Sequence, residues 1–279
     1  MRNLLLAILL TSLLTAGCIA SVVDTPIPPT TVIIPTFTSD SATVPPTAPP
    51  EVTATETPTA TPEPSPTTGP TAAATPTIPP TPDPNQNVGD ALFTDNFTGE
   101  IGWLWTFKDD VAEFGVKDGQ LNIVTFKQGG GWRYSLYFDA VHGDQQLAVS
   151  AHTNRCADAD EYGVAYRGLT EPENTYNMYI FSLNCAGQAR VLKLSGSDLV
   201  SLKDWQEYPA INKGANADNA ITIWMFKDEF NFYVNDRYLF TLNDSTFAEG
   251  YYGFFVDGGA SGDASFTFTN LLVKEVKTP

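Results

Sequence analysis

The clearest pattern in the chain lies between residues 219 and 242, where apolar and polar positions alternate. Residues 221–226 and 230–234 each place an apolar side chain at every second position, and residues 238–242 form a third run. A period of two predicts β-strands. Asn235 and Asp236 separate the last two runs and favour a tight hairpin turn, because both tolerate positive φ. Such a meander has one apolar face, which needs a second sheet to cover it.

Short runs of the same kind recur through the rest of the C-terminal part, and turn residues separate them. Asp118-Gly119 is one strong hairpin signal. No long stretch has a helical period. The further strands are expected at residues 91–97, 113–116, 121–124, 132–138, 146–153, 162–167, 175–183, 189–194, 251–256 and 264–276. The pattern predicts an all-β fold, an antiparallel β-sandwich (jelly roll) of roughly a dozen strands.

Composition divides the chain sharply. Eighteen of the 21 prolines fall in residues 1–89, whereas residues 90–279 contain nearly all the aromatic side chains. We therefore predict a signal peptide at 1–17, a lipidated Cys with a disordered Pro/Thr-rich linker at 18–87, and one sandwich domain at 88–279. The linker has too few large apolar side chains to offset the entropy of ordering, so we expect an extended stalk.

The N-terminus has the form of an export signal. A basic start at residues 1–3 precedes an apolar run at 4–14, which is too short to span a membrane. The run ends in Leu-Thr-Ala-Gly-Cys, which resembles the lipobox of bacterial lipoproteins, in which the Cys is acylated. The resemblance implies a lipid anchor on Cys18 and a membrane as partner. Ile19 follows the Cys where Asp tends to retain lipoproteins at the inner membrane, so the expected location is the outer membrane or cell surface.

The predicted domain is acidic. Residues 90–279 contain 26 Asp and Glu against 14 Lys and Arg, a formal charge of −12. A strongly negative surface repels phosphate backbones, so we expect no nucleic-acid partner.

Three stretches of the domain resemble a known superfamily. They are Asp95-Asn96-Phe97 near the start, residues 162–167 with the Tyr-rich strand after them, and residues 230–235 before a closing Phe268-Thr269-Asn270-Leu271. Together they resemble the concanavalin A-like lectins and glucanases, and within them the laminin-G-like modules related to 3-keto-disaccharide hydrolase-type domains. The resemblance implies a β-sandwich and carbohydrate binding.

Cys156 and Cys185 are the two thiols of the domain, and both stand in turn-like contexts. The export signal predicts an oxidising compartment, so we expect a disulfide between them. A catalytic or metal-binding thiol is disfavoured, because the chain has no Cys-x-x-Cys motif.

The sequence offers little for catalysis. The Glu-x-Asp-x-x-Glu run of the superfamily's glucanases is absent, and His142 and His152 have no recognisable partners for a triad or a zinc site. We therefore assign no catalytic residue and no required cofactor. Asp158 and Asp160, next to Glu161, are weak candidates for calcium ligands. A solvated acidic loop is the alternative.

Alternation within residues 162–167 places Tyr162, Val164 and Tyr166 toward the core and Gly163, Ala165 and Arg167 on the opposite face. Small residues beside an Arg predict an indentation with hydrogen-bond donors, which suits sugar hydroxyls. The candidate ligand-binding residues are Arg167, Asn177, Tyr179, Trp132 and Trp205. For the aromatic residues the alternative is core packing, and for Arg167 a structural ion pair.

The sequence thus predicts a surface-anchored, monomeric and non-catalytic carbohydrate-binding module. Two alternatives stay open. One is a sugar (glycoside) hydrolase of the 3-keto-disaccharide hydrolase type, and the other is a protein-binding envelope or adhesion module.

Overall fold

The computed structural model describes residues 80–98, 106–129, 131–171 and 175–278, and in these ranges it contains strands and no helix. No segment there qualifies as a helix able to cross a membrane. The strands are β1 (Val88–Asp95), β2 (Phe107–Lys108), β3 (Ala112–Lys117), β4 (Gln120–Thr125), β5 (Arg133–His142), β6 (Gln145–Arg155), β7 (Glu161–Glu171), β8 (Thr175–Asn184), β9 (Gln188–Ser195), β10 (Asp198–Glu207), β11 (Ala217–Phe226), β12 (Glu229–Val234), β13 (Arg237–Asn243), β14 (Gly250–Asp257) and β15 (Ser265–Val276).

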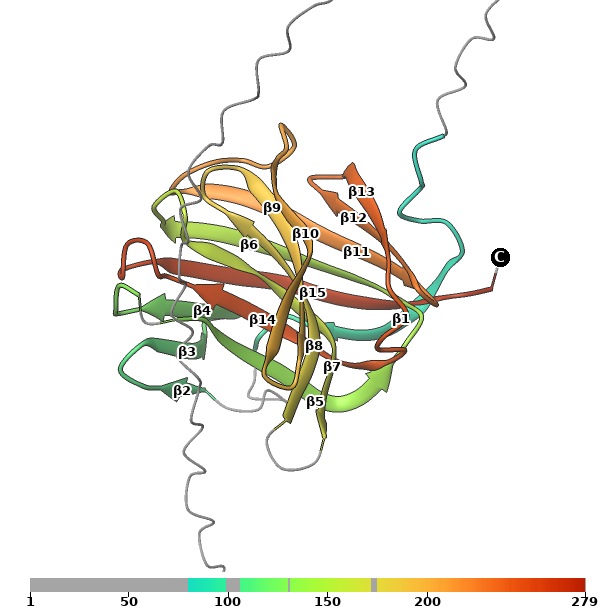
Figure 1. The fold of residues 1–279 in the computed structure, drawn as a ribbon, viewed down its shortest axis with the longest axis horizontal. Helices are drawn as coiled ribbons and strands as arrows, with labels where there is room; N and C mark the ends of the chain where they lie inside the picture. The colour runs from blue at the N-terminus through green and yellow to red at the C-terminus, as the bar shows by residue number, and fades with distance from the viewer. Residues whose placement is uncertain (1–79, 99–105, 130, 172–174, 279) are drawn as a thin grey trace, which may run out of the picture. The chain divides into compact units, whose positions relative to one another are not determined.

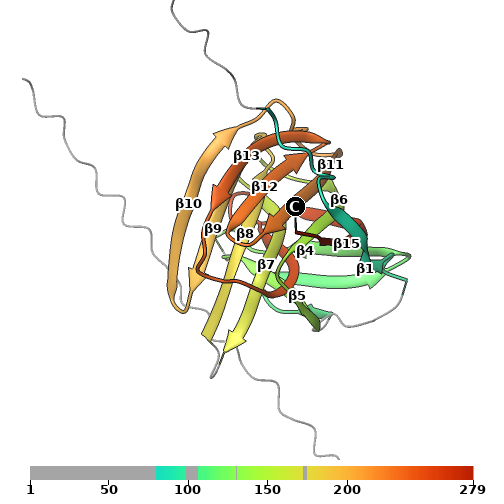
Figure 2. The same cartoon turned by 90° about the vertical axis from the view of Figure 1, so that its right-hand side faces the viewer.

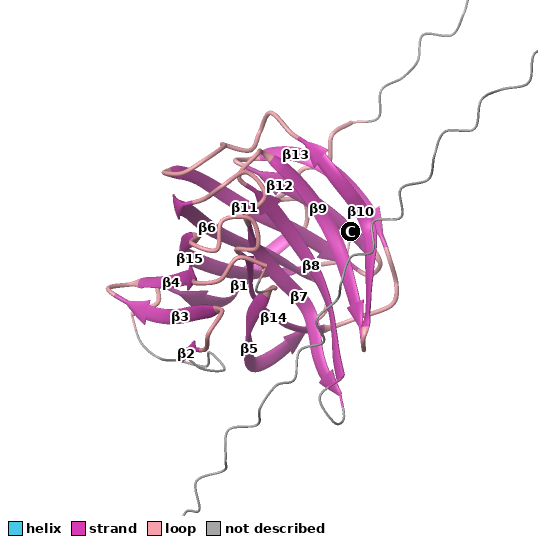
Figure 3. Cartoon of the chain, turned by 60° about the vertical axis from the view of Figure 1, so that its left-hand side comes forward, coloured by secondary structure: helices cyan, strands magenta, loops and turns pink. Residues whose placement is uncertain are grey.

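Two antiparallel sheets form a sandwich (Figures 1, 2 and 3). The nine-stranded sheet has the order β13-β12-β11-β6-β15-β4-β3-β2, with β1 also paired to β15. The six-stranded sheet has the order β10-β9-β8-β7-β14-β5. The predicted fold class is therefore confirmed.

The long last strand β15 organises the larger sheet. One of its edges pairs with β6 along most of its length. The other edge pairs with β4 over residues 265–268 and with β1 over residues 271–276. The two ends of the domain therefore lie side by side in one sheet, because β1 is the first strand and β15 the last.

The core lies between the sheets and is rich in aromatic rings. Phe232 of β12 packs 4.7 Å from Phe181 of β8, and Phe230 lies 5.5 Å from Tyr166 of β7, measured between ring centroids. All four side chains are fully buried. The alternation expected for residues 162–166 is confirmed, since Tyr162, Val164 and Tyr166 all belong to this core.

The predicted hairpin turns are present. Asp118 and Gly119 have φ of 55° and 75°, and Asn235 and Asp236 have φ of 52° and 60°. Strands β2 and β10 are not predicted by the sequence pattern. Strand β10 is an edge strand whose side chains are mostly exposed, so it carries no apolar period.

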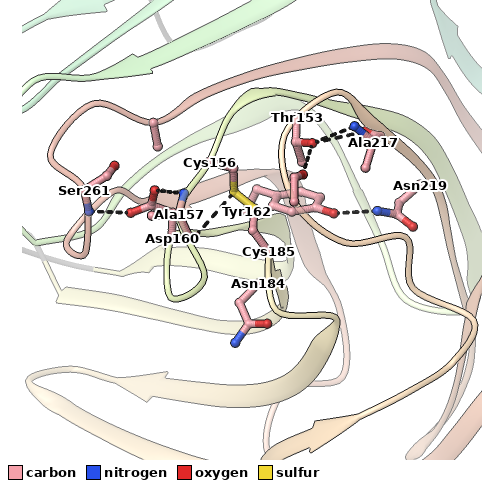
Figure 4. The surroundings of a disulfide bond; sticks show 12 residues. Thr153, Cys156, Ala157, Asp160, Tyr162, Asn184, Cys185, Ala217, Asn219 and Ser261 are labelled. Atoms are coloured by element: carbon pink, nitrogen blue, oxygen red, sulfur yellow. Dashed lines mark hydrogen bonds between the residues drawn. A yellow bond between two sulfur atoms is a disulfide. The ribbon is translucent and has the colours of Figure 1, made fainter.

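A disulfide closes one end of the sandwich, which confirms the expected pairing (Figure 4). Cys156 follows β6 of the nine-stranded sheet and Cys185 follows β8 of the six-stranded sheet, with their Cα atoms 6.1 Å apart. Beside it, Asn219 Nδ2 donates to the Tyr162 hydroxyl at 2.8 Å, which joins β11 to β7. Covalent and polar links therefore hold the two sheets together at this end.

We expect replacement of Cys156 and Cys185 by Ala to lower the free energy of unfolding by about 3 kcal/mol, because the bond spans 29 residues and restricts the unfolded chain. Urea unfolding of the exported chain measures the difference. Mass spectrometry after alkylation should find no free thiol at Cys156 in the native protein, and an alkylated Cys156 would contradict the pairing. Cys18→Ser is the matched control and should leave the urea midpoint unchanged.

Candidate functional site

Charged and polar side chains gather at one end of the outer face of the six-stranded sheet. Asp257 of β14 pairs with Glu161 of β7, which pairs with Asn184 of β8. In the next row Ser182 of β8 pairs with Arg190 of β9. Paired residues of neighbouring strands share a face, so these five side chains project together, away from the inter-sheet core. We call them the Glu161 cluster.

An ion pair forms the centre of this cluster. Arg190 Nη2 donates to both carboxylate oxygens of Glu161 at 2.7 Å. Ser182 Oγ donates to Glu161 Oε2 at 3.2 Å. The Glu161 side chain is only 10% exposed, whereas the Arg190 side chain is 22% exposed. The guanidinium is thus the more accessible partner, and it retains donors beyond those that bind Glu161.

Burial perturbs both carboxyl groups of the cluster. Loss of solvation raises the pKa of Glu161 to about 7, although the charge and hydrogen bond of Arg190 oppose that shift. Burial also raises the pKa of Asp257, with the nearby Asp160 adding to the effect. Two carboxyl groups that hold protons more tightly than usual lie on neighbouring strands, and such groups are typical of functional sites.

Aromatic rings stand at both edges of the same face. The Trp205 ring on edge strand β10 lies 4.6 Å from the Arg190 guanidinium carbon, in a cation–π contact. Trp132, directly before the other edge strand β5, packs 5.6 Å from Tyr134 and 6.1 Å from Phe255. The structure therefore places the two candidate tryptophans on the outer face of the six-stranded sheet, and both are partly exposed.

The indentation expected at Gly163 and Ala165 does not form. A Cβ atom on Gly163 would lie 2.1 Å from the carbonyl oxygen of Phe181 on the neighbouring strand, so the glycine permits a close backbone approach. Ala165 is fully buried in a second apolar cluster on the outer face, with Leu136, Ile180 and Leu192. Small size at these positions therefore serves packing.

Arg167 does not lie on the outer face as an exposed donor, which corrects the placement expected from alternation. A register shift between Tyr166 and Leu169, together with a φ of 48° at Arg167, turns this side chain out of the period-two pattern. It is fully buried, and its guanidinium lies 4.8 Å from the ring of the core residue Phe230. The bulge overrides the alternation.

The Arg167 guanidinium joins loops from both sheets at the end of the sandwich opposite the disulfide. Nη1 donates to the carbonyl oxygens of Lys227 at 2.6 Å and Phe247 at 2.9 Å, and Nη2 donates to that of Gly143 at 3.1 Å. Arg167 also lines a pocket of about 490 Å³, whose other lining residues include Asp144, Asp228 and Glu249. Its hydrogen bonds to backbone carbonyls favour a structural role.

Tyr179 and Asn177 are likewise occupied within the fold. Tyr179 pairs with Tyr166 and therefore faces the core, where its hydroxyl donates to Asp244 Oδ1 at 2.5 Å. Asn177 Oδ1 accepts a hydrogen bond from the Gly196 amide at 3.0 Å, beside the turn between β9 and β10. The structure does not bring either residue together with Trp132 or Trp205 on the outer face.

The calcium candidates lie in the loop before β7. Asp160 is fully buried, and its two carboxylate oxygens accept hydrogen bonds from the amides of Ser261 at 2.9 Å and Ala157 at 2.7 Å. Asp158 is exposed. Within the part of the chain that the structure describes, no three His, Cys, Asp or Glu side chains are grouped so as to hold a metal ion. Calcium binding stays a prediction.

From the sequence, Glu161 is singled out only as a neighbour of the calcium candidates, and Arg190 and Asp257 are not among the predicted site residues. One signal was available, because Arg190 interrupts an otherwise apolar strand at residues 189–192. The pairing of β7 with both β8 and β14 is not readable from local sequence, and this pairing brings the cluster together. Cys18 and the predicted signal peptide lie outside the described residues.

Comparisons with known proteins agree with the fold. No family model matches the chain, and no curated protein matches it in sequence. Among solved structures, it is similar to a Bacillus subtilis protein of unknown function with a galectin-like fold, at 11% identity over 68% of this chain and 99% of that one, with a TM-score of 0.52. A GlcNAcα1-4Gal-releasing endo-β-galactosidase from Clostridium perfringens matches at 8% identity over 71% of this chain and 65% of that one, with a TM-score of 0.50.

A carbohydrate-binding module, CBM66 from Bacillus subtilis, also matches, at 15% identity over 62% of this chain and 96% of that one, with a TM-score of 0.48. At such identities these similarities concern the fold. The chain is a two-sheet antiparallel β-sandwich, and it is similar in fold to the galectin-like structure.

Replacing Arg167 by Ala should lower the free energy of unfolding by about 3 kcal/mol or more, because the carbonyl oxygens of Gly143, Lys227 and Phe247 lose their donors. Arg167→Lys keeps the charge without the planar fork and should recover only part of the loss. Urea unfolding measures both. Arg155→Ala, which removes an exposed pair with Asp263, is the control and should change little. A native midpoint in Arg167→Ala would refute the structural role.

The raised pKa of Glu161 predicts a pH effect on stability. A carboxyl whose pKa rises on folding stabilises the folded state while it is protonated, so this contribution is lost as pH rises from about 4.5 to about 7. Glu161→Gln should therefore show a smaller decline of unfolding free energy across this window than the native chain. Urea unfolding at a series of pH values tests this, and identical slopes in the two proteins would contradict it.

Proposed function

We propose that this chain is a carbohydrate-binding module that holds sugar at the Glu161 cluster, on the outer face of the six-stranded sheet. The observation that carries the proposal is the partly exposed Arg190 guanidinium, fixed by Glu161 and stacked on Trp205. A guanidinium fork held in place can donate two hydrogen bonds to adjacent hydroxyls of a sugar. A partly exposed indole can cover the apolar C–H face of the same ring.

The structural neighbours support a ligand of this class. They include a protein with a galectin-like fold and an endo-β-galactosidase that releases GlcNAcα1-4Gal. The proposal extends that chemistry to this chain, with residues that the chain itself supplies. Trp132, at the far edge of the face, would contact a longer glycan that extends across the sheet.

The anchoring part of the proposal rests on the sequence. Acylation of Cys18 would hold the chain on the outer membrane or cell surface, and the Pro/Thr-rich linker of residues 18–87 would carry the monomeric domain of residues 88–279 beyond the envelope. Such a stalk places the binding face where glycans outside the cell can reach it.

Glycoside hydrolysis is a second candidate, which one observation favours. Glu161 and Asp257 are paired across neighbouring strands, and both have raised pKa values, as a general acid in a glycosidase requires. The double hydrogen bond from Arg190 opposes this role, because it holds Glu161 as an ion-pair partner. Binding is therefore the stronger proposal.

A glycan array probed with the exported chain tests the proposal. We expect a signal that falls at least tenfold in Arg190→Ala and in Trp205→Ala, because each change removes about 1.5 kcal/mol or more of hydrogen bonding or stacking. Arg155→Ala removes an exposed Arg at another place and should keep the signal. The melting temperature of each variant shows whether it is folded. Trp205→Ala should disturb the fold less than Arg190→Ala, because Trp205 lies on an edge strand.

The other outcomes separate the alternatives. Release of reducing sugar that Glu161→Gln abolishes would favour the hydrolase. A pull-down that finds a protein partner, with no array signal, would favour an adhesion module. Running the array with calcium and with a chelator tests the calcium prediction. A binding signal unaffected by Arg190→Ala and Trp205→Ala would reject the site.

A further inference from the structure

Part of the outer face of the nine-stranded sheet is contacted by the residues that lead into the domain. Residues 80–87, which we call the strap, run without regular structure over 80–83 and form a turn over 84–87, directly before β1 (Figures 1 and 2). Three side chains of the sheet donate hydrogen bonds to its carbonyl oxygens. They are Tyr233 to Pro82 at 3.1 Å, Gln146 to Pro84 at 2.6 Å, and Trp224 to Gln86 at 2.9 Å.

The strand registers place these three donors on the outer face. Trp224 of β11 pairs directly with Gln146 of β6, and both alternate with core residues such as Ile223 and Leu147. Tyr233 of β12 lies between the core residues Phe232 and Val234. Although they point away from the core, Trp224 is only 6% exposed and Tyr233 only 1%.

The chemistry of this face fits the proline-containing strap. The turn bonds of the strap end on the carbonyl oxygens of Asp83 and Asn85, which leaves those of Pro82, Pro84 and Gln86 to accept hydrogen bonds from the sheet. Aromatic surfaces with polar donors recognise proline-rich segments in this way, and the chain's stiffness lowers the entropy lost on docking. Here the carbonyl oxygens of three alternate residues of the strap are bound, and an apolar cluster of Trp224, Tyr233 and Val276 lies on the same face.

We propose that the outer face of the nine-stranded sheet is a docking surface for a proline-rich segment, and that its occupant is the chain's own residues 80–87. The strap then fixes the point at which the linker leaves the domain. The two sheets stack core to core, so their outer faces point in opposite directions. Docking therefore attaches the linker to the face opposite the Glu161 cluster, so that the cluster faces away from the linker's point of attachment.

Hydrogen exchange of the full exported chain, followed by mass spectrometry without added glycan, tests the docking. The reporters are three amides that donate to strap residues. Those of Asn85 and Gln86 donate to Asp83 at 2.9 Å and 3.1 Å, and that of Val88, the first residue of β1, donates to Asn85 at 3.3 Å. We expect them to exchange more slowly than amides of the upstream linker. Combining Tyr233→Phe, Trp224→Phe and Gln146→Leu should speed their exchange by about tenfold or more, because three donors to the strap are lost.

Tyr238→Phe is the matched control. It removes a hydroxyl from the same outer face, but that hydroxyl lies 2.8 Å from Thr241 Oγ1 and does not bond the strap. Its strap amides should exchange as in the native chain. Slow exchange in β8 shows that each variant is folded, and the single change Tyr233→Phe gives a milder test.

Two results would overturn the docking. The first is that the reporter amides of the native chain exchange as fast as amides of the upstream linker. The second is that these amides exchange at the native rate in the triple variant although it is folded. The experiment contains no glycan, so its failure and the failure of carbohydrate binding are separate outcomes.

Discussion

The constraint on which the rest of the structure depends is the burial of two aromatic sheet faces against each other. Rings such as Phe230, Phe232, Tyr166 and Phe181 leave solvent completely, and the apolar area that they bury is the main driving force for folding. Successive side chains of a strand point to opposite faces, so the neighbours of each inward-facing side chain lie on an outer face. The sandwich therefore presents two outer faces and two ends, and each is completed by different chemistry.

The ends are closed by polar or covalent links between the sheets. At one end the Cys156–Cys185 disulfide joins β6 to β8, and at the other the Arg167 guanidinium binds carbonyl oxygens of three loops. A buried guanidinium is costly to desolvate, and its bonds to carbonyl oxygens and its position over Phe230 offset that cost. These contacts explain how an Arg can be buried inside β7, directly after the core residue Tyr166.

The two outer faces differ in what covers them. On the nine-stranded sheet, Trp224, Tyr233 and Gln146 bind the chain's own strap, so this face is already covered where they lie. On the six-stranded sheet, the Glu161–Arg190 pair and Trp205 remain partly accessible at one end. A half-buried ion pair is weak evidence for stability, and its place beside a partly exposed indole is the basis of the carbohydrate-binding proposal.

Local sequence determined the strands other than β2 and β10, the hairpin turns at Asp118-Gly119 and Asn235-Asp236, and the core side of residues 162–166, because period two and positive-φ residues act over a few positions. Only the tertiary structure decided where the Arg167 side chain lies, since a bulge with φ of 48° at this residue breaks the alternation. It also decided the Glu161 cluster, whose members stand on β7, β8, β9 and β14. Strand pairing over long sequence separations brings them together, and no local pattern encodes which strands become neighbours.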